Sequence, residues 1–271
     1  MKVKILLVLL SIIGVNTSYA ANWSYSGANG PEHWGQLDAS FAVCETGKQQ
    51  TPINIQLSQV KKNSSALPIA INYTFNKDKL TETLNGETTF TFPSGKLLTY
   101  NGHTLQIDVT DAANDDAVFW QNSAYHLLQF HFHSPSEHLV DGKTYPLEIH
   151  FVNENVRTGK VLVLGVFIAE GKKDNPTLTE IIKDAPTSLE QSNSIDTNIV
   201  LAEHLLPPNS AYFAYMGSLT TPPCTEGFQW IVFKNPIYAS KQQIQALAKI
   251  LQDNVRPVQK LNGRVVKEYK V

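Results

Sequence analysis

Two histidines that could bind a metal stand in an alternating stretch, residues 129–133 (QFHFH). If this stretch is a β-strand, Gln129, His131 and His133 lie on one face and the two phenylalanines on the other. The Cα atoms of the two histidines would be ~6.6 Å apart, whereas tetrahedral zinc with bonds of ~2.05 Å needs nitrogens roughly 3.3 Å apart, so the imidazoles must lean together. For a single histidine, a polar strand face is the commoner explanation.

A third histidine, His150, lies in a second alternating stretch, residues 148–152. In a neighbouring strand of the same sheet, ~4.8 Å away, it would face the first pair. Three histidines with a vacant fourth position are the ligand set of a catalytic zinc site. Gln129 and Glu148 share these strand faces and are residue types that orient metal-bound imidazoles through the second ring nitrogen. The grouping therefore predicts a Zn²⁺ centre held by the three histidines.

Longer motifs surround these residues. They are QFHFHSPSEH at 129–138, YPLEIH at 145–150, GSLTTPPCTEG at 217–227 and NGPEHW at 29–34. In order and spacing, the motifs resemble the α-class carbonic anhydrases, specifically the bacterial exported type, from about Trp23 to Arg256. The resemblance implies a zinc enzyme that hydrates carbon dioxide reversibly to bicarbonate and a proton, with a zinc-bound hydroxide as the nucleophile.

The resemblance also implies how the metal is held. His131 and His133 would bind zinc through Nε2 and His150 through Nδ1. Gln129 would support His131, and Glu148 would support His150, without either touching the metal.

Two further positions match residues that lie beside the zinc-bound hydroxide in the family, Thr220 and Glu137. A threonine hydroxyl that donates to a glutamate can only accept from the hydroxide, so the pair would fix the direction of the attacking lone pair. His103, in the match to the family's shuttle motif at 100–103, is the expected proton shuttle because the pKa of histidine suits transfer near neutral pH. The family further implies cis bonds at Thr51-Pro52 and Pro222-Pro223.

Carbon dioxide requires an apolar wall beside the nucleophile. Val152 shares a strand face with His150 by alternation. The resemblance adds further residues to this pocket: Val163, Leu219 and Trp230 in the wall, and Thr221 at the mouth. The four apolar residues could equally be ordinary core. The remaining histidines are assigned structural roles: His33, His126, His138 and His204.

Two other functions compete with this one. A non-catalytic carbonic-anhydrase-like binding module would keep the fold without turnover, and loss of a ligand histidine would be its signature; all three are present. A zinc esterase or another hydrolase on an unrelated fold would usually need a carboxylate base or ligand close to the histidine pair.

Strands must position these residues. Short β-branched and aromatic runs are separated by turn signals such as Asn85-Gly86, Asn101-Gly102 and Asp141-Gly142, and are expected to pair as antiparallel hairpins. These runs are 69–75, 88–92, 104–109, 124–133, 147–153, 161–169 and 229–233. One clear helix is expected after the N-cap Ser240, and a weaker one over 178–183. With the resemblance, the expected fold is β-dominated α+β: a single domain, residues 21–271, around one large, twisted, mostly antiparallel sheet of about ten strands with short peripheral helices.

The first twenty residues have the layout of a cleaved signal peptide, with Lys2 and Lys4 before an apolar run and a small-residue site at Ala20. The run is about half the ~20 residues that a membrane anchor needs, so we expect an exported protein, periplasmic in a Gram-negative cell or secreted. In such an oxidising compartment Cys44 and Cys224 are expected to form a disulfide rather than two free thiols.

The partners follow from charge and from the resemblance. The 22 basic and 24 acidic residues give a net charge of -2, which leaves no basic excess for nucleic acid or an anionic membrane. The expected partner is a small molecule, carbon dioxide or bicarbonate. Bacterial relatives are often dimers, so a homodimer stays open, although the sequence indicates no interface residues.

Overall fold

The computed structural model describes residues 22–63, 67–73, 81–84, 87–91, 95–110, 116–186, 188–189, 192–194, 204–208 and 211–270. The expected signal peptide, residues 1–20, and the turn signal at Asn85-Gly86 lie outside the described residues. None of the helices in the described part of the chain is long and apolar enough to cross a membrane.

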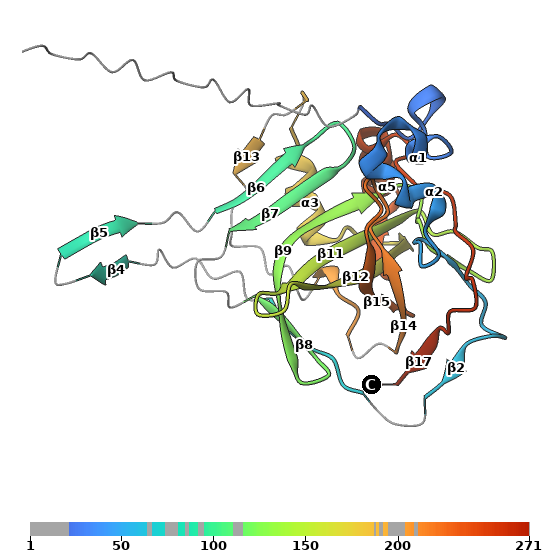
Figure 1. Cartoon of the computed structure of the whole chain (residues 1–271). Coiled ribbons are helices and arrows are strands. Elements are labelled where there is room, and N and C mark those ends of the chain that lie inside the picture. Colours follow the sequence, from blue (N-terminus) through green and yellow to red (C-terminus); the bar gives the residue numbers. More distant parts are fainter. Residues whose placement is uncertain are drawn as a thin grey trace, which may run out of the picture.

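One large sheet organises the chain, and within the described residues it has thirteen strands (Figure 1). Its strands are β2 (Lys61–Lys62), β3 (Ala70–Asn72), β6 (Gly95–Tyr100), β7 (Leu105–Thr110), β8 (Ala117–Trp120), β9 (Ser123–His133), β11 (Leu147–Asn155), β12 (Lys160–Gly171), β13 (Ser192–Ser194), β14 (Tyr212–Ser218), β15 (Glu226–Phe233), β16 (Ile237–Ser240) and β17 (Lys267–Tyr269). Two small sheets pair β1 (Asn54–Ile55) with β10 (Leu139–Val140) and β4 (Thr81–Leu84) with β5 (Glu87–Thr91).

Most neighbours in the large sheet are antiparallel, as expected, but β12 runs parallel to β15 and β16, and β17 runs parallel to β2. The sheet has more strands than the ten expected because several edge strands are only two or three residues long and carry no pattern. Strand β14 was also missed. Its side chains are buried at nearly every position, so it lacks the alternation that marks a half-exposed strand.

Helices are short and lie around the sheet: η1 (Gly27–Asn29), α1 (Trp34–Leu37), η2 (Ala39–Phe41), α2 (Val43–Thr46), α3 (Pro176–Lys183) and α5 (Lys241–Leu251). The predicted N-cap Ser240 begins α5, where its side chain accepts from the Gln243 backbone and Gln243 completes a capping box. The weaker predicted helix is α3. It begins two residues earlier than expected because Asn175 caps it and proline occupies its first position.

The two faces of the central strands have different neighbours. Phe130, Phe132, Ile149 and Phe151 point into the main core and are at most 1% exposed. The alternate residues of β9 and β11 therefore face the opposite side, which places Gln129, His131, His133, Glu148 and His150 on one surface of the sheet.

Candidate metal centre

Three histidines converge where β9 and β11 pair. The antiparallel register sets His131 directly opposite His150, with His133 two residues along β9. The ring centroids of His133 and His150 are 4.5 Å apart, and those of His131 lie 5.0 Å from His133 and 5.3 Å from His150. One ligand nitrogen from each ring falls within 4.8 Å of the other two. The arrangement thus offers three imidazole nitrogens to a single ion.

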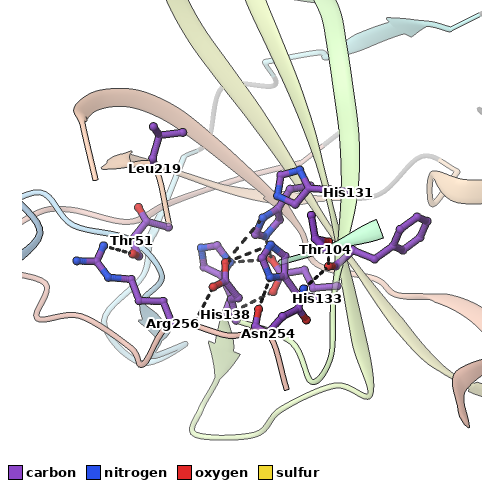
Figure 2. A network of polar contacts seen from close by, with 12 residues as sticks. Thr51, Thr104, His131, His133, His138, Leu219, Asn254 and Arg256 are labelled. Atoms are coloured by element: carbon purple, nitrogen blue, oxygen red, sulfur yellow. Dashed lines mark hydrogen bonds and ion pairs between the residues drawn. The ribbon is translucent and has the colours of Figure 1, made fainter. Parts of the chain in front are cut away.

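The second nitrogen of each ring is held by an acceptor. Nδ1 of His131 donates to Gln129 Oε1 over 2.8 Å, and Nε2 of His150 donates to Glu148 Oε1 over 2.9 Å. Nδ1 of His133 donates to the backbone carbonyl of Asn254 over 2.7 Å, and Figure 2 shows Asn254 beside this ring. These bonds leave Nε2 of His131, Nε2 of His133 and Nδ1 of His150 with their lone pairs toward the common point.

The free nitrogens suit a metal cation. Burial lowers the pKa of His131 well below its ordinary value, and it also lowers the pKa of His133, so both rings are neutral near pH 7. Nε2 of His133 is buried and has no hydrogen-bond partner among the described residues. Buried polar atoms rarely stay unsatisfied in native proteins. Three converging imidazoles, one of them with an orphaned nitrogen, fit Zn²⁺, which binds three protein ligands in catalytic sites.

Glu148 supports more than one imidazole. Its Oε1 accepts from Nε2 of His150 and, over 2.7 Å, from Nδ1 of His138, while its Oε2 accepts from the His138 backbone N–H. Nε2 of His138 lies 2.6 Å from Oη of Tyr215. Burial alone would raise the pKa of Glu148, but the interactions with His138 and His150 outweigh it and hold the pKa well below its usual range. His138, Glu148 and His150 also lie close enough to bind a metal, but here their facing atoms already bond one another.

Two residues that act on the centre were not identified from the sequence. His138 was assigned a merely structural role, whereas it holds the carboxylate that orients His150. Asn254 carries no motif; its carbonyl fixes His133, and its amide bonds the backbone of Phe132 and of His103. No local pattern could have indicated the role of Asn254, because Asn254 is 121 residues from His133 in the sequence.

Glu137 lies against the free side of the centre. Its Oε1 accepts from the Arg256 backbone N–H over 2.8 Å, and its Oε2 lies 3.5 Å from Nε2 of His133 and 3.8 Å from Nδ1 of His150. Oε2 is buried without a hydrogen-bond partner among the described residues. The Thr220 hydroxyl, which the resemblance assigns to this carboxylate, therefore makes no hydrogen bond to Oε2 in the structure, although Thr220 lines the same cavity.

A cavity of about 160 Å³ opens over the three histidines. The five residues named for the substrate pocket from the sequence all line it: Val152, Val163, Leu219, Thr221 and Trp230. Strand register explains part of the wall, because Val152 of β11 pairs with Val163 of β12, which pairs with Trp230 of β15. The sequence did not indicate other lining residues: Trp23, Tyr25, Asn101, Thr104 and Gln106.

His103 also lines this cavity, at a turn held by Asn101, whose side chain accepts from the backbone N–H groups of His103 and Thr104. The His103 ring stacks on Trp23, with centroids 3.7 Å apart and planes 9° from parallel. Partial burial lowers the pKa of His103 below its ordinary value.

Outside the cavity, Cys44 and Cys224 form a disulfide that ties α2 to the loop after β14. The two implied cis bonds, Thr51-Pro52 and Pro222-Pro223, are cis in the structure, and Ser134-Pro135 is cis as well.

Comparison with known proteins gives a consistent result over nearly the whole chain. A family model described as eukaryotic-type carbonic anhydrase matches residues 29–270. A carbonic anhydrase of Pectobacterium atrosepticum is 36% identical over 267 residues and covers 98% of both proteins. The α-carbonic anhydrase of Thermovibrio ammonificans, solved with the inhibitor sulfanilamide, has a TM-score of 0.77 at 38% identity and covers 92% of this chain and 100% of that chain. Dioscorin dioA3 of Dioscorea japonica is 30% identical over 267 residues, covering 95% of this chain and 90% of that protein. Related chains thus carry different names, and a shared fold does not by itself fix the chemistry of the site.

Proposed function

Because the chain belongs to the eukaryotic-type (α) carbonic anhydrase family, we propose that it binds Zn²⁺ through His131, His133 and His150 and hydrates carbon dioxide reversibly to bicarbonate and a proton. One observation carries the metal assignment: three imidazole nitrogens converge, and one of them, Nε2 of His133, is buried without a partner among the described residues. When bound, zinc makes water an effective nucleophile near neutral pH, a property for which carbonic anhydrases are the standard example.

The residues around the ligands keep the centre open on one side. The second nitrogen of each ring donates a hydrogen bond to Gln129, to Glu148 or to the Asn254 carbonyl. Each ring therefore presents a single lone pair toward the centre. Glu137 meets the free side of the centre with Oε2 alone, because its Oε1 accepts from the Arg256 backbone N–H. The vacant side of the centre faces the cavity, where substrate enters.

Thr220 and Glu137 are proposed to orient the attacking group. Oε2 of Glu137 is the available acceptor, since Oε1 already accepts from Arg256. If the Thr220 hydroxyl donates to Oε2, its oxygen can only accept a hydrogen bond from the nucleophile, which fixes the nucleophile's lone pair toward the substrate.

The cavity wall suits a small apolar substrate. Val152, Val163 and Trp230 present hydrocarbon and ring surface directly beside the histidines, with Leu219 and Thr221 completing the lining. A linear molecule without hydrogen-bond donors loses little on leaving water for such a wall. His103, on the same cavity, is proposed to carry the product proton to buffer, because a neutral imidazole accepts a proton readily near pH 7.

We propose further that the protein is exported, with residues 1–20 removed as a signal peptide. The disulfide between Cys44 and Cys224 supports an oxidising compartment. N-terminal sequencing of the exported protein should give Ala21 as the first residue.

The metal assignment is tested by His131→Ala, with His126→Ala on the same strand as the matched control. Purified protein should contain one zinc per chain and hydrate carbon dioxide in a stopped-flow pH-indicator assay. His131→Ala should lose both, because two imidazoles cannot complete a catalytic site, while His126→Ala should lose neither. Carbon dioxide hydration retained by His131→Ala would contradict the assignment, and a zinc-loaded wild type without turnover would support the non-catalytic module instead.

A further inference from the structure

The loop between β14 and β15, residues 219–225, carries both Thr220 and Thr221 and is here called the threonine loop. Its beginning is held by Ser218, whose backbone N–H donates to Oγ1 of Thr51 over 3.0 Å and whose Oγ accepts from the Thr51 backbone. Its far end is held by residues 44–50. The loop that presents Thr220 therefore depends on a segment about 170 residues earlier in the sequence, since Thr51 and Ser218 are 167 residues apart.

One attachment at the far end is covalent. Cys224 is bonded to Cys44 across a separation of 180 residues. Cys224 is fully buried, and its backbone N–H donates to the Thr221 carbonyl over 2.8 Å. Fixing Cys224 thus restrains the turn that immediately follows Thr220.

The second attachment is a side-chain amide. Nε2 of Gln50 donates to the Cys224 carbonyl and to Oε1 of Glu226, both over 3.0 Å. Oε1 of Glu226 also accepts from the Gln49 backbone over 2.6 Å. Gln50 is only 3% exposed, and a Cβ at Gly47 would collide with this amide. The Gln50 amide is therefore confined to one position, where it bonds Cys224, the residue that the disulfide also fixes.

We propose that Gln50 is a positioning residue for Thr220: its amide fastens the threonine loop in parallel with the disulfide, so that the loop keeps its geometry when either attachment is lost. The inference rests on the proposed function, because it concerns the group that Thr220 orients. Both attachments restrain the position of Cys224. Losing one of them should therefore change the geometry of the threonine loop little, whereas losing both should change it strongly.

The test is a double-mutant cycle with Gln50→Met, which keeps the volume but removes the donor, and the pair Cys44→Ser/Cys224→Ser. Gln49→Met is the matched control, because only the backbone of exposed Gln49 contacts Glu226. For zinc-saturated, folded enzyme, Gln50→Met and the serine pair should each lower kcat/KM for carbon dioxide by less than about threefold, and the combination by more than about tenfold. Amide hydrogen exchange of residues 218–227 in the metal-free protein should accelerate sharply only in the combination.

Several results would overturn the proposal. One is a combined effect no larger than the product of the separate effects. Another is a Gln50→Met protein that matches the Gln49→Met control in both backgrounds, in kcat/KM and in hydrogen exchange. A purely structural role would lower the melting temperature and leave kcat/KM per bound zinc unchanged. If the zinc-loaded wild type did not hydrate carbon dioxide, the proposed function would fail, and the exchange rates of residues 218–227 would still decide whether Gln50 fastens the loop.

Discussion

Each of the three candidate ligands is supported by a different kind of acceptor: an amide oxygen for His131, a backbone carbonyl for His133 and a carboxylate for His150. A carboxylate acceptor raises the basicity of its imidazole more than a neutral acceptor does, because it stabilises positive charge on the ring. The buried charge of Glu148 is in turn stabilised by His138. Of the three histidines, His150 is therefore expected to donate its electron pair most strongly to a bound metal.

At the same scale, His103→Ala is expected to slow turnover without changing the step at the metal. The substitution removes the imidazole that would take the product proton to buffer. Steady-state kcat should fall by about 100-fold, at the low end of general acid–base contributions, while isotope exchange between carbon dioxide and water should be preserved. Added imidazole buffer should restore kcat, and absence of rescue would count against a shuttle at this position.

The stacking of Trp23 on His103 leads to a pH prediction. Burial lowers the pKa of His103, so removing the stacked ring by Trp23→Ala should raise that pKa toward its ordinary value. Hydration requires neutral His103 to accept a proton, so the midpoint of the pH dependence of kcat should move to higher pH. NMR titration of the His103 ring measures the pKa directly. An unchanged or lower pKa in Trp23→Ala would contradict the assigned cause.

At the scale of elements, strand register decides which side chains meet. The pairing of β9 with β11 sets His131 beside His150, and β12 presents Gly165 opposite His150 on the other side of β11. A Cβ on Gly165 would lie 3.0 Å from Oε1 of Glu148. The glycine therefore leaves the space that the carboxylate needs in order to reach the His150 ring.

Gly165→Ala is accordingly expected to weaken metal binding. The added methyl should displace the Glu148 carboxylate and lower zinc affinity by about 10-fold or more, since outer partners of metal-bound histidines contribute 10- to 100-fold. Competition with a chromophoric chelator measures the affinity. The melting temperature of the metal-free protein serves as a control for general damage, and unchanged zinc affinity would show that Glu148 tolerates the methyl group.

For the whole molecule, contacts distant in the sequence close the site. The segment after α5 returns to the centre, where the Asn254 carbonyl holds His133 and the Arg256 backbone holds Glu137. The Arg256 guanidinium donates to the carbonyls of Thr51 and Cys44, and Figure 2 shows it reaching Thr51. Residues 44–51 and 254–256 are thereby joined beside the cavity, so the site depends on contacts between segments about 200 residues apart in the sequence.

The disulfide is expected to contribute strongly to the stability of the domain. Closing a loop across a separation of 180 residues restricts the unfolded chain, and the serine pair Cys44→Ser/Cys224→Ser should lower the free energy of unfolding by about 2–5 kcal/mol. Urea denaturation of the wild type with and without reductant gives the same comparison without mutation. A change below about 1 kcal/mol in both experiments would mean that the cross-link restrains only its own loop.

The sequence by itself determined the features that neighbouring residues encode. Alternation in residues 129–133 put His131 and His133 on one face, and Ser240 set the start of α5. A second alternating stretch supplied His150, and the motifs around both stretches identified the family, which brought Thr220 and Glu137 into the prediction. Such signals are local, because side-chain direction repeats every two residues in a strand and capping acts within one helical turn.

Only the tertiary structure decided which distant groups complete the site. The bond from His133 to the Asn254 carbonyl, the sharing of Glu148 with His138 and the stacking of Trp23 on His103 join residues with no common pattern. Strand β14, buried at every position but Met216, lacked the alternation from which it could be recognised. These contacts depend on how the whole sheet closes and on which backbone groups remain unpaired, and neither is set by the residues adjacent in the sequence.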